Sequence, residues 1–552
     1  MSRLLPTRPA VSGQFDVVVI GGGINGVAIG RECASAGRRT LLLERHDLAS
    51  GTTSRSTRII HGGLRYLQFG EIGLVRESLR ERERLLRERP HLVRPMSFVL
   101  ALGRERTLSA LEIRSGLWFY RRFAGMHSPS ADTIHELREF EKQLDAGQHW
   151  SLFHYDDAQC EFPERLVAEW LIEAAADGAV IRNYTAALGV RLAHGRVLGV
   201  IVRDLLTNEE FTVDARWIIN ATGPWADHIC GDSGIDTAGP MIGGVRGSHL
   251  VLPQFPGMPG SAVYTHANDG RAIFVIPWNG QVLLGTTEIR DSSNPSGVQP
   301  APEEIRYLLD SINNLFPNAR ITEDKVLYAF AGVRPLPYVP DKAPNAITRR
   351  HLLRNHAADG AAGLISVIGG KLTTAASLAR QCAHAIGIKV AETPLPIACI
   401  GTASGLESTI SQWSTLVAQT AGITEQSARA MAAWHGRRAF CVARLAGTEP
   451  QLARPLFDST EHIVAEAVSA VRYEYAVTLA DILLRRVPVA LSGSWNEHSS
   501  RVAAKRIGAA LRWERDEIEY QLEEFENERN AFLRKPARPG NARSTLPSNR
   551  AA

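Results

Sequence analysis

Residues 15 to 44 read FDVVVIGGGINGVAIGRECASAGRRTLLLE, and this stretch decides the fold that the sequence predicts. Phe15 to Ile20 is a short apolar, β-branched run, as expected of a buried parallel strand. Gly21 to Gly26 satisfies the G-x-G-x-x-G pattern, and a helix is expected to follow and to stop at Gly37. A second strand is predicted from Thr40 to Leu43. The stretch therefore predicts a strand–turn–helix–strand unit that binds the pyrophosphate of a dinucleotide.

Each part of that unit has a physical task. Gly21 permits the tight turn, Gly23 lets the backbone approach a pyrophosphate, and Gly26 lets helix and strand pack closely. Glu44 ends the second strand, where a carboxylate accepts hydrogen bonds from ribose hydroxyls and repels a 2′-phosphate. The chain has no second G-x-G-x-x-G, which favours one resident FAD over an exchanging NAD.

Composition limits the other classes of protein. The chain has 552 residues, enough for about three domains, and its hydrophobic share of 44% and charged share of 22% are ordinary for globular proteins. Its six cysteines include no C-x-x-C pair, which argues against a disulfide scaffold, a zinc ribbon and a cysteine-ligated iron–sulfur cluster. We therefore expect no metal site and a reducing, cytoplasmic location.

The net charge of +4 is concentrated in the tail, because the residues from Arg534 onward carry five basic and no acidic side chains. The rest of the chain then carries about −1, so no nucleic-acid partner is expected. No apolar run reaches the ~18 residues that cross a bilayer, and residues 1–10 lack the apolar core of a secretory signal.

Eight motifs follow one another downstream of the first strand pair. Together they resemble the FAD-dependent glycerol-3-phosphate dehydrogenases, flavin enzymes that oxidise sn-glycerol 3-phosphate to dihydroxyacetone phosphate. They occur in the order of that family between residue 15 and about residue 390. The motifs are RHDLASGTTSRSTRIIHGGLRYL (45–67), IINATGPWAD (218–227), RGSHLVLP (246–253), IFVIPW (273–278), LLGTTE (283–288), AGVRPL (331–336), AITR (346–349) and SVIGGKLTT (366–374).

The resemblance implies an α/β fold with three parts. A Rossmann-like FAD-binding domain with an interleaved α+β substrate cap is expected over 15–395, the cap covering roughly 90–160 and 245–340. An all-α domain is expected over 396–535, where apolar residues recur three and four apart. Residues 1–14 are expected to be flexible, and the Pro/Ser/Asn/Arg-rich residues 536–552 disordered.

The same resemblance assigns site residues. Arginine's planar fork suits a phosphate dianion, and Arg65 and Arg334 both lie near glycines. The substrate-binding residues implied are Arg65, Tyr66, Arg334 and Lys371. The cofactor-binding residues implied are Gly21, Gly23, Ile24, Asn25, Gly26, Glu44, Arg45, Ser50, Thr52, Thr53, Ser54, His61, Gly62, Gly63, Thr222, Gly223, Gly370, Lys371, Leu372 and Thr373.

Catalysis requires an acceptor for the substrate's hydroxyl proton and a stabilising charge for the reduced flavin. His249 is our first choice of base, because imidazole titrates near the operating pH, and a desolvated Lys371 is the alternative. Lys371 also begins a predicted helix, whose N-terminus would stabilise an anionic flavin. Arg334 and Lys371 complete the catalytic set with His249.

The electron acceptor expected from the family is a membrane quinone. Gly103 to Phe123 mixes arginines with aromatic residues, and it is predicted either to lie in a bilayer interface, on the inner face of the cell membrane, or to pack in the core. Glu77 to Arg89 alternates in charge sign, which predicts a solvent-facing helix. The C-terminal helices are interpreted as packing or subunit contact, with a homodimer left open.

Three alternatives stay open at this point. The same oxidation could use O2 and form hydrogen peroxide, an amine or amino-acid oxidase shares the broad fold, and a flavin-bound sensor would not turn over. Three departures from the family pattern concern loops and substrate fit. They are the acidic residues Glu161 and Glu164 before Arg165-Leu166, Glu288 in place of an aspartate, and the unmatched Ala131 to Trp150.

Overall fold

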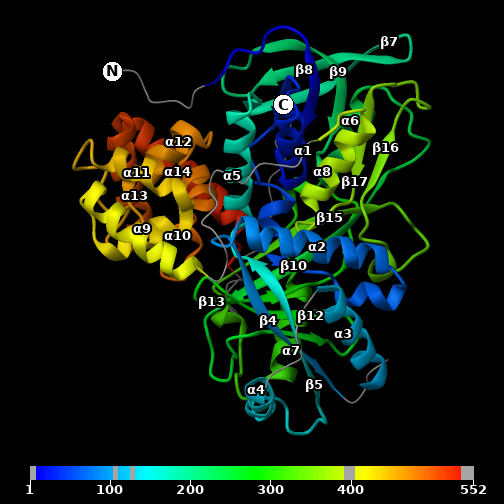
Figure 1. Cartoon of the computed structure of the whole chain (residues 1–552), viewed down its shortest axis with the longest axis vertical. Coiled ribbons are helices and arrows are strands. Elements are labelled where there is room, and N and C mark those ends of the chain that lie inside the picture. Colours follow the sequence, from blue (N-terminus) through cyan, green and yellow to red (C-terminus); the bar gives the residue numbers. More distant parts are fainter. Residues whose placement is uncertain (1–7, 104–109, 125–130, 391–404, 536–552) are drawn as a thin grey trace, which may run out of the picture.

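The computed structural model describes residues 8–103, 110–124, 131–390 and 405–535. Two β-sheets and a group of C-terminal helices make up this part of the chain (Figure 1). The fold class expected from the sequence, a Rossmann-like α/β unit with a cap and a helical C-terminal domain, is confirmed. The predicted tail 536–552 and residues 1–7 lie outside the described residues.

The first sheet carries the predicted unit at its centre. Strand β1 (Phe15–Ile20) pairs in parallel with β2 (Thr40–Leu43) on one side and with β9 (Glu210–Asn220) on the other. The sheet runs in the order β16-β17-β9-β1-β2-β6, with β7 and β8 joined to it through β9. The other bounds are β6 Val180–Arg182, β7 Thr185–Ala193, β8 Arg196–Asp204, β16 Leu352–Asn355 and β17 Leu364–Ile368.

Three helices pack on one face of this sheet and bury its apolar side chains. They are α1 (Ile24–Ser35), α5 (Pro163–Ala176) and α8 (Ala375–Ala385). Strands β7 and β8 and the short helix α6 (Ala226–Asp232) cover the opposite face. Because both faces of the sheet are covered, the side chains of β1 and β2 are buried on both sides. This explains why their sequences are largely continuous apolar runs, as is typical of parallel strands.

The second sheet holds nine strands in the order β14-β10-β13-β12-β11-β4-β5-β3, with β15 paired to β10. It includes strands from before and after β9, so two distant stretches of chain build it. The bounds are β3 Ile59–Ile60, β4 Val93–Leu102, β5 Ser151–Cys160, β10 Ile242–Leu252, β11 Ala262–His266, β12 Ala272–Trp278, β13 Gln281–Gly285, β14 Ile289–Arg290 and β15 Tyr328–Pro337. Helices α4 (Ala131–Glu141) and α7 (Pro302–Leu315) and the loops beside them pack on one face.

The sequence predicted a solvent-facing helix from Glu77 to Arg89. Helix α2 (Ile72–Glu88) corrects this prediction, because part of its charged surface is buried. Arg82 and Arg89 are fully buried. Arg82 Nη1 lies 2.6 Å from Asp157 Oδ1 on β5, and Arg89 Nη2 lies 2.6 Å from Glu173 Oε1 on α5. Two charges of this segment therefore form buried ion pairs with the rest of the fold. Helix α3 (Ala110–Ala124) packs beside α2.

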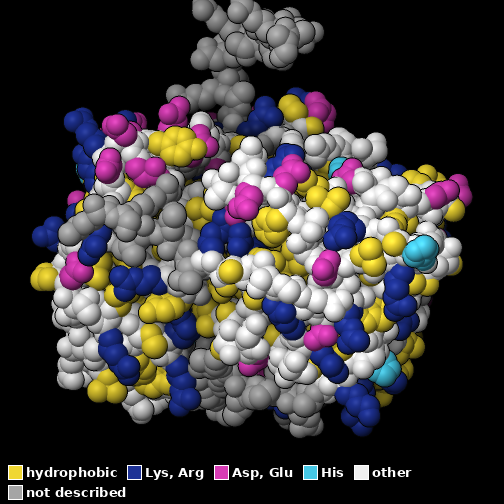
Figure 2. All heavy atoms as spheres, turned by 90° about the horizontal axis from the view of Figure 1, so that it is seen from above, with side chains coloured by type: hydrophobic (Ala, Val, Ile, Leu, Met, Phe, Trp, Pro, Cys, Tyr) yellow, Lys and Arg dark blue, Asp and Glu magenta, His cyan; other side chains and the backbone are white. Residues whose placement is uncertain are grey.

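The C-terminal helices form a separate group, drawn from yellow to red at one side of Figure 1. A π-helical turn, Asp481–Arg486, connects two of them on the side that meets the first sheet. The helices are α9 Leu406–Ala421, α10 Glu425–His435, α11 Ala439–Ala446, α12 Val464–Tyr473, α13 Glu497–Leu511 and α14 Arg515–Phe532. On the face seen in Figure 2, basic and acidic side chains are interspersed.

Candidate functional site

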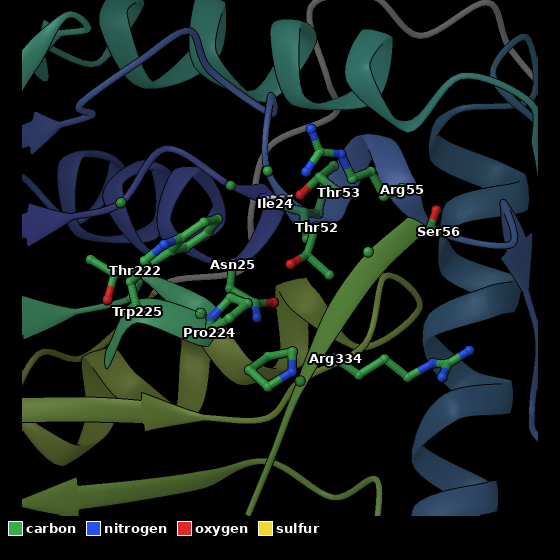
Figure 3. A pocket seen from close by; sticks show the side chains of 18 of the residues that line it. Ile24, Asn25, Thr52, Thr53, Arg55, Ser56, Thr222, Pro224, Trp225 and Arg334 are labelled. Carbon is green, nitrogen blue, oxygen red and sulfur yellow. Dashed lines mark hydrogen bonds between the residues drawn. The ribbon is translucent and has the colours of Figure 1, made fainter. Parts of the chain in front are cut away.

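A cavity of about 740 Å³ lies where the carboxyl ends of β1, β2 and β9 meet the second sheet. Its lining combines the glycine-rich turn, the loop after β2, the turn after β9, strand β15 and the turn after β17. Figure 3 shows Ile24 and Asn25 at the start of α1 close to Thr52 and Thr53, with Thr222 to Trp225 on one side and Arg334 on β15. Segments more than 300 residues apart in the chain thus share one site.

The glycine-rich turn has the shape that a pyrophosphate requires. Gly21 has a φ of 110°, and a Cβ there would lie 2.6 Å from the carbonyl oxygen of Ala221. A Cβ on Gly26 would lie 1.9 Å from the carbonyl oxygen of Gly21, so only glycine lets α1 pack this close to the turn. At Gly23 the nearest atom to such a Cβ is Thr53 Oγ1, at 3.4 Å, which leaves the cavity side open. Helix α1 therefore points its N-terminus into open space.

Glu44 closes the end of the cavity beside β2. Its carboxylate accepts hydrogen bonds from the backbone N–H of Gly22, at 2.6 Å, and of His46, at 2.8 Å. Burial raises the pKa of Glu44, and these backbone donors oppose that shift. An ionised carboxylate has about four acceptor positions, so two remain for ribose hydroxyls.

Replacing Glu44 with alanine is expected to weaken retention of a dinucleotide, because the ribose loses its acceptor and the N–H groups of Gly22 and His46 lose theirs. The measurement is the flavin content of the purified protein after extensive dialysis. Asp214→Ala is the control, since that side chain is 60% exposed and lies outside the cavity lining. Unchanged flavin content in Glu44→Ala would remove the ribose assignment.

The loop after β2 is held by its own hydroxyl groups. Thr53 Oγ1 accepts from the N–H of Ile24 at 3.1 Å, and Thr52 donates to the carbonyl of Val333 at 2.9 Å. Ser54 donates to the carbonyl of Ala49 at 2.6 Å and is absent from the cavity lining. The loop thereby joins the first helix to the second sheet around the cavity.

Three arginines surround one carboxylate on the cap side of the cavity. Glu288 Oε1 lies 2.7 Å from Arg349 Nη2 and 3.6 Å from Arg65 Nη2. Arg334 donates to Thr286 Oγ1 at 2.9 Å and to the carbonyl of Thr287 at 3.3 Å. Burial favours the neutral acid, but the three arginines hold the pKa of Glu288 below its usual value. The cluster carries a net charge of about +2, which suits a phosphate dianion.

Arg334 is half-buried at the cavity wall, and desolvation lowers its pKa to about 10, with the neighbouring arginines adding to the effect and Glu288 opposing it. The guanidinium therefore stays protonated at neutral pH. Arg349 was absent from the residues assigned from the sequence, although its motif AITR was recognised. Glu288 could have pointed to Arg349, because this carboxylate lies in another matched motif and a carboxylate in the site needs cationic partners.

Lys371 follows a glycine pair that no other residue type fits easily. Gly369 and Gly370 have φ values of 80° and 101°, and a Cβ on Gly370 would lie 2.4 Å from Asn25 Nδ2. The ammonium lies 4.0 Å from the ring centroid of Tyr66. Burial lowers the pKa of Lys371 to about 7. The predicted helix start was wrong, since α8 begins at Ala375 and residues 371–374 form a turn before it.

The two histidines at the site are both neutral near pH 7. His249 Nε2 lies 3.0 Å from Thr57 Oγ1, and its ring stacks on Phe330 at 5.1 Å. Burial, with cationic arginines nearby, lowers the pKa of His249 to about 3. Burial lowers the pKa of His61 to about 3 as well, with Lys371 adding to the shift. Within the described part of the chain, the buried Nδ1 of His249 has no hydrogen-bond partner.

The structure brings most of the predicted site residues to this cavity, and leaves a few beside it. The predicted residues that line it are Gly21, Gly23, Ile24, Asn25, Glu44, Arg45, Ser50, Thr52, Thr53, His61, Tyr66, Thr222, Gly223, His249, Arg334, Gly370, Lys371, Leu372 and Thr373. Gly26, Ser54, Gly62 and Gly63 are not among its lining residues, and Arg65 lines a second cavity of about 200 Å³.

Known protein families match both the FAD-binding part of the chain and its C-terminal helical part. The sequence model described as FAD dependent oxidoreductase matches residues 16–376, and the C-terminal domain of alpha-glycerophosphate oxidase matches residues 397–518. A glycerol-3-phosphate dehydrogenase of Synechocystis sp. is 37% identical over 492 residues, which cover 86% of this chain and 89% of that protein. The chain belongs to the FAD-dependent glycerol-3-phosphate dehydrogenase family.

Two further relatives place the chain within this family. The D-erythritol 1-phosphate dehydrogenase of Brucella abortus is 37% identical over 372 residues, covering 67% of this chain and 73% of that protein. The crystal structure of the glycerol-3-phosphate dehydrogenase from Bacillus halodurans complexed with FAD matches with a TM-score of 0.74 and 25% identity, over 95% of this chain and 96% of that one.

FAD is the cofactor of this family, and the cavity fits it. The fit rests on the glycine cradle, the open N-terminus of α1, the carboxylate of Glu44 and the long lining. Among the described residues, no group of three or more His, Cys, Asp and Glu side chains could hold a metal ion. In the same part of the chain, no helix has the length and apolar character to span a bilayer.

Proposed function

We propose that the chain oxidises sn-glycerol 3-phosphate to dihydroxyacetone phosphate and passes the electrons to a membrane quinone. The observation that carries the proposal is the cluster of Arg65, Arg334 and Arg349 beside the dinucleotide cavity. Bound FAD supplies the acceptor for the hydride from C2 of the substrate at its N5. The protein's task is then to hold the phosphate, to accept the hydroxyl proton and to balance charge.

The phosphate is held by the arginines. Arg334 already has its guanidinium fixed by Thr286 and Thr287, so little side-chain freedom is lost when a ligand binds. Arg349 is oriented in the same way by Glu288 and by the carbonyl of Ile347, at 2.9 Å. Preorganised cations fix the distance between the substrate's C2 and the cofactor.

The hydroxyl proton passes to His249. Its ring is neutral and lines the cavity, and the hydrogen bond to Thr57 orients it. Its low pKa makes it a weak base in the free site, and an anionic substrate beside it would raise that pKa. Lys371, with a pKa of about 7, is the alternative base.

The charge of Lys371 gives the reaction a pH dependence. Since burial lowers the pKa of Lys371 to about 7, its ammonium is present below that pH and is lost as the pH rises through it. If the cation stabilises phosphate or reduced flavin, kcat/KM falls above about pH 7. Lys371→Arg should remove this falling limb, because arginine stays charged up to a pH of about 12. A profile of kcat/KM from about pH 6 to 9 checks this, and a rising limb near 7 would instead make Lys371 the base.

The substrate and the reaction class are tested by one anaerobic titration. Addition of glycerol 3-phosphate to the purified flavoprotein should bleach the flavin absorbance stoichiometrically. D-Erythritol 1-phosphate belongs in the same experiment, because a relative that acts on it by name is as similar in identity as the first. Bleaching only by a D-amino acid would favour an amino-acid oxidase, and no bleaching would favour a sensor.

The acceptor is tested separately, by comparing quinone reduction with hydrogen peroxide formation by the same enzyme. Support for a membrane acceptor comes from helix α3, whose Ile113, Leu117 and Tyr120 are buried while Leu111, Trp118 and Phe119 are exposed. The helix thus has one face packed in the core and one exposed face, which correspond to the two interpretations made from the sequence. Exposed aromatic residues flanked by arginines suit the interface of an anionic bilayer on the cytoplasmic side.

Replacing Trp118 and Phe119 with serine is expected to lower binding to vesicles that contain anionic lipid by about tenfold, because two exposed aromatic anchors are lost. Sedimentation with vesicles measures the bound fraction, and anaerobic flavin bleaching should be unaltered. A Leu205→Ser variant, also exposed but on the turn after β8, is the matched control. Equal vesicle binding by all three proteins would refute the membrane-facing role.

A further inference from the structure

The loop after β2 has one side that lines the cavity and another side that faces away from it. Residues on both sides of Asp47, including Glu44 and Ser50, line the cavity, whereas the side chain of Asp47 turns away and is only 1% exposed. Ala49 has a φ of 64°, a left-handed conformation that is costly for a residue with a side chain. A loop of this shape needs contacts outside itself to hold it.

Those contacts come from the C-terminal helical domain, more than 430 residues further along the chain. Arg486 binds Asp47 with both terminal nitrogens, at 2.7 Å and 2.9 Å, and Arg485 Nε donates to the same carboxylate. All three side chains are at most 5% exposed. Although burial opposes the ionised form, the two arginines hold the pKa of Asp47 below its usual value.

The two arginines are themselves fixed within their domain. Arg485 donates to Asp481 Oδ1 at 2.9 Å and to Glu528 Oε1 on α14 at 2.6 Å. Arg486 Nε donates to the carbonyl of Glu474 at 3.0 Å. The π-helical turn that bears both arginines sets them side by side, and such turns often occur at functional sites. The cations are thus presented to the loop in one arrangement.

Two further contacts join the same surfaces. The Tyr184 hydroxyl donates to Asp481 Oδ1 at 2.8 Å, while the Tyr184 N–H donates to the carbonyl of His46 at 3.1 Å. On the other side of the loop, the Arg55 guanidinium lies 5.3 Å from the ring centroid of Phe532, at the end of α14. Arg55 lines the cavity, so α14 supports the wall directly.

We infer that the C-terminal helical domain is part of the cofactor-binding apparatus, with Arg485 and Arg486 acting on the Asp47 loop as positioning residues for FAD. Neither arginine lines the cavity, and both shape its wall from behind. The inference goes beyond the proposed reaction and depends only on the FAD site. Because linkage is reciprocal, FAD binding must also stabilise the docking of this domain on the first sheet.

The test compares two equally buried ion pairs between the same parts of the chain. Arg486→Met removes the bidentate contact to the loop. Arg165→Met removes the pair of Arg165 on α5 with Glu474, a 2.7 Å contact in which both side chains are at most 1% exposed and which does not touch the loop. For each FAD-stripped protein, the Kd of FAD is measured by flavin fluorescence, together with Tm.

Arg486→Met is expected to raise the Kd of FAD by about tenfold or more, while Arg165→Met raises it by less than about threefold at a similar loss of Tm. Arg486→Lys, which keeps the charge but loses the fork, should fall between Arg486→Met and the native protein. An unchanged Kd in Arg486→Met, or the same increase in both methionine variants, would overturn the inference.

Hydrogen exchange of the native chain keeps the inference testable if a variant does not fold. Adding FAD to the stripped protein should slow amide exchange in residues 477–487, which lie outside the cavity lining, more than in residues 425–446 of the same domain. Protection of both segments to the same degree, or of neither, would contradict the coupling between the Asp47 loop and its arginines.

Discussion

Arg334→Ala is expected to lower kcat/KM for glycerol 3-phosphate by about 10²- to 10³-fold while FAD stays bound. The guanidinium is half-buried and already oriented by Thr286 and Thr287, so its loss removes a fixed cation from the cavity wall. Truncating one partner of a buried charged hydrogen bond costs about 2–5 kcal/mol, and each ~1.4 kcal/mol is a factor of ten in rate. Steady-state kinetics and the flavin spectrum measure the two quantities.

Two variants make this result specific. Arg334→Lys keeps the charge but not the fork, so it should recover part of the lost kcat/KM. Arg350→Ala removes an exposed arginine next to Arg349 and should leave kinetics near normal. Near-normal kinetics of Arg334→Ala would refute the role given to it, and loss of FAD from that variant would show a role in cofactor binding instead.

Gly26→Ala is expected to give a colourless protein that does not retain FAD. A Cβ at this position would lie 1.9 Å from the carbonyl oxygen of Gly21, far inside van der Waals contact. Backbone atoms on both sides must then move, so either α1 shifts along its axis or the turn opens. Both changes displace the N–H groups that face the pyrophosphate. Flavin content and the Kd of added FAD measure the loss.

Gly30→Ala is the matched control for Gly26→Ala, because it adds the same methyl group one turn further along α1. A Cβ there would meet nothing within 4 Å, and alanine is favoured over glycine in a helix by about 1 kcal/mol. This variant should keep its flavin and be at least as stable as the native chain. Full flavin in both variants would mean that the turn tolerates the displacement.

Local signals in the sequence were enough for the two strands β1 and β2 at the centre of the first sheet. The run from Phe15 to Ile20 and the run from Thr40 to Leu43 are strands with the predicted bounds. They were predictable because apolar runs, glycines and a strand-end acid lie within one stretch of about 30 residues. Gly26 was assigned to close packing between helix and strand, and the 1.9 Å approach measures that role.

Pairings between distant residues could not be predicted in this way. Helix α2 was expected to face solvent because its charges alternate, but Arg82 and Arg89 find partners on β5 and α5, about 75 to 85 residues away. The same limit applies to Asp47, whose partners lie in a domain interpreted only as packing or subunit contact. A charge pattern shows that partners are needed and does not show where they lie.

The site residues could be predicted where they lie in motifs that match the family. Arg334 and Lys371 come together at the cavity from separate motifs, as the resemblance implied. Arg349 and its link to Glu288 were missed, since neither motif alone shows that the two side chains meet. The exact start of α8 was missed because a turn of four residues precedes it, and sequence patterns place helix ends poorly.

Because the strands of the two sheets alternate along the chain, strands that pair with each other are synthesised at well-separated times. Strand β1 leaves the ribosome about 190 residues before its neighbour β9, and β17, which pairs with β9, follows later still. At about 5–20 residues per second, roughly 17–70 s separate the emergence of the glycine turn from that of Lys371. During that interval the nascent chain exposes unpaired strand edges, so chaperones that shield such edges should strongly affect the yield of active enzyme.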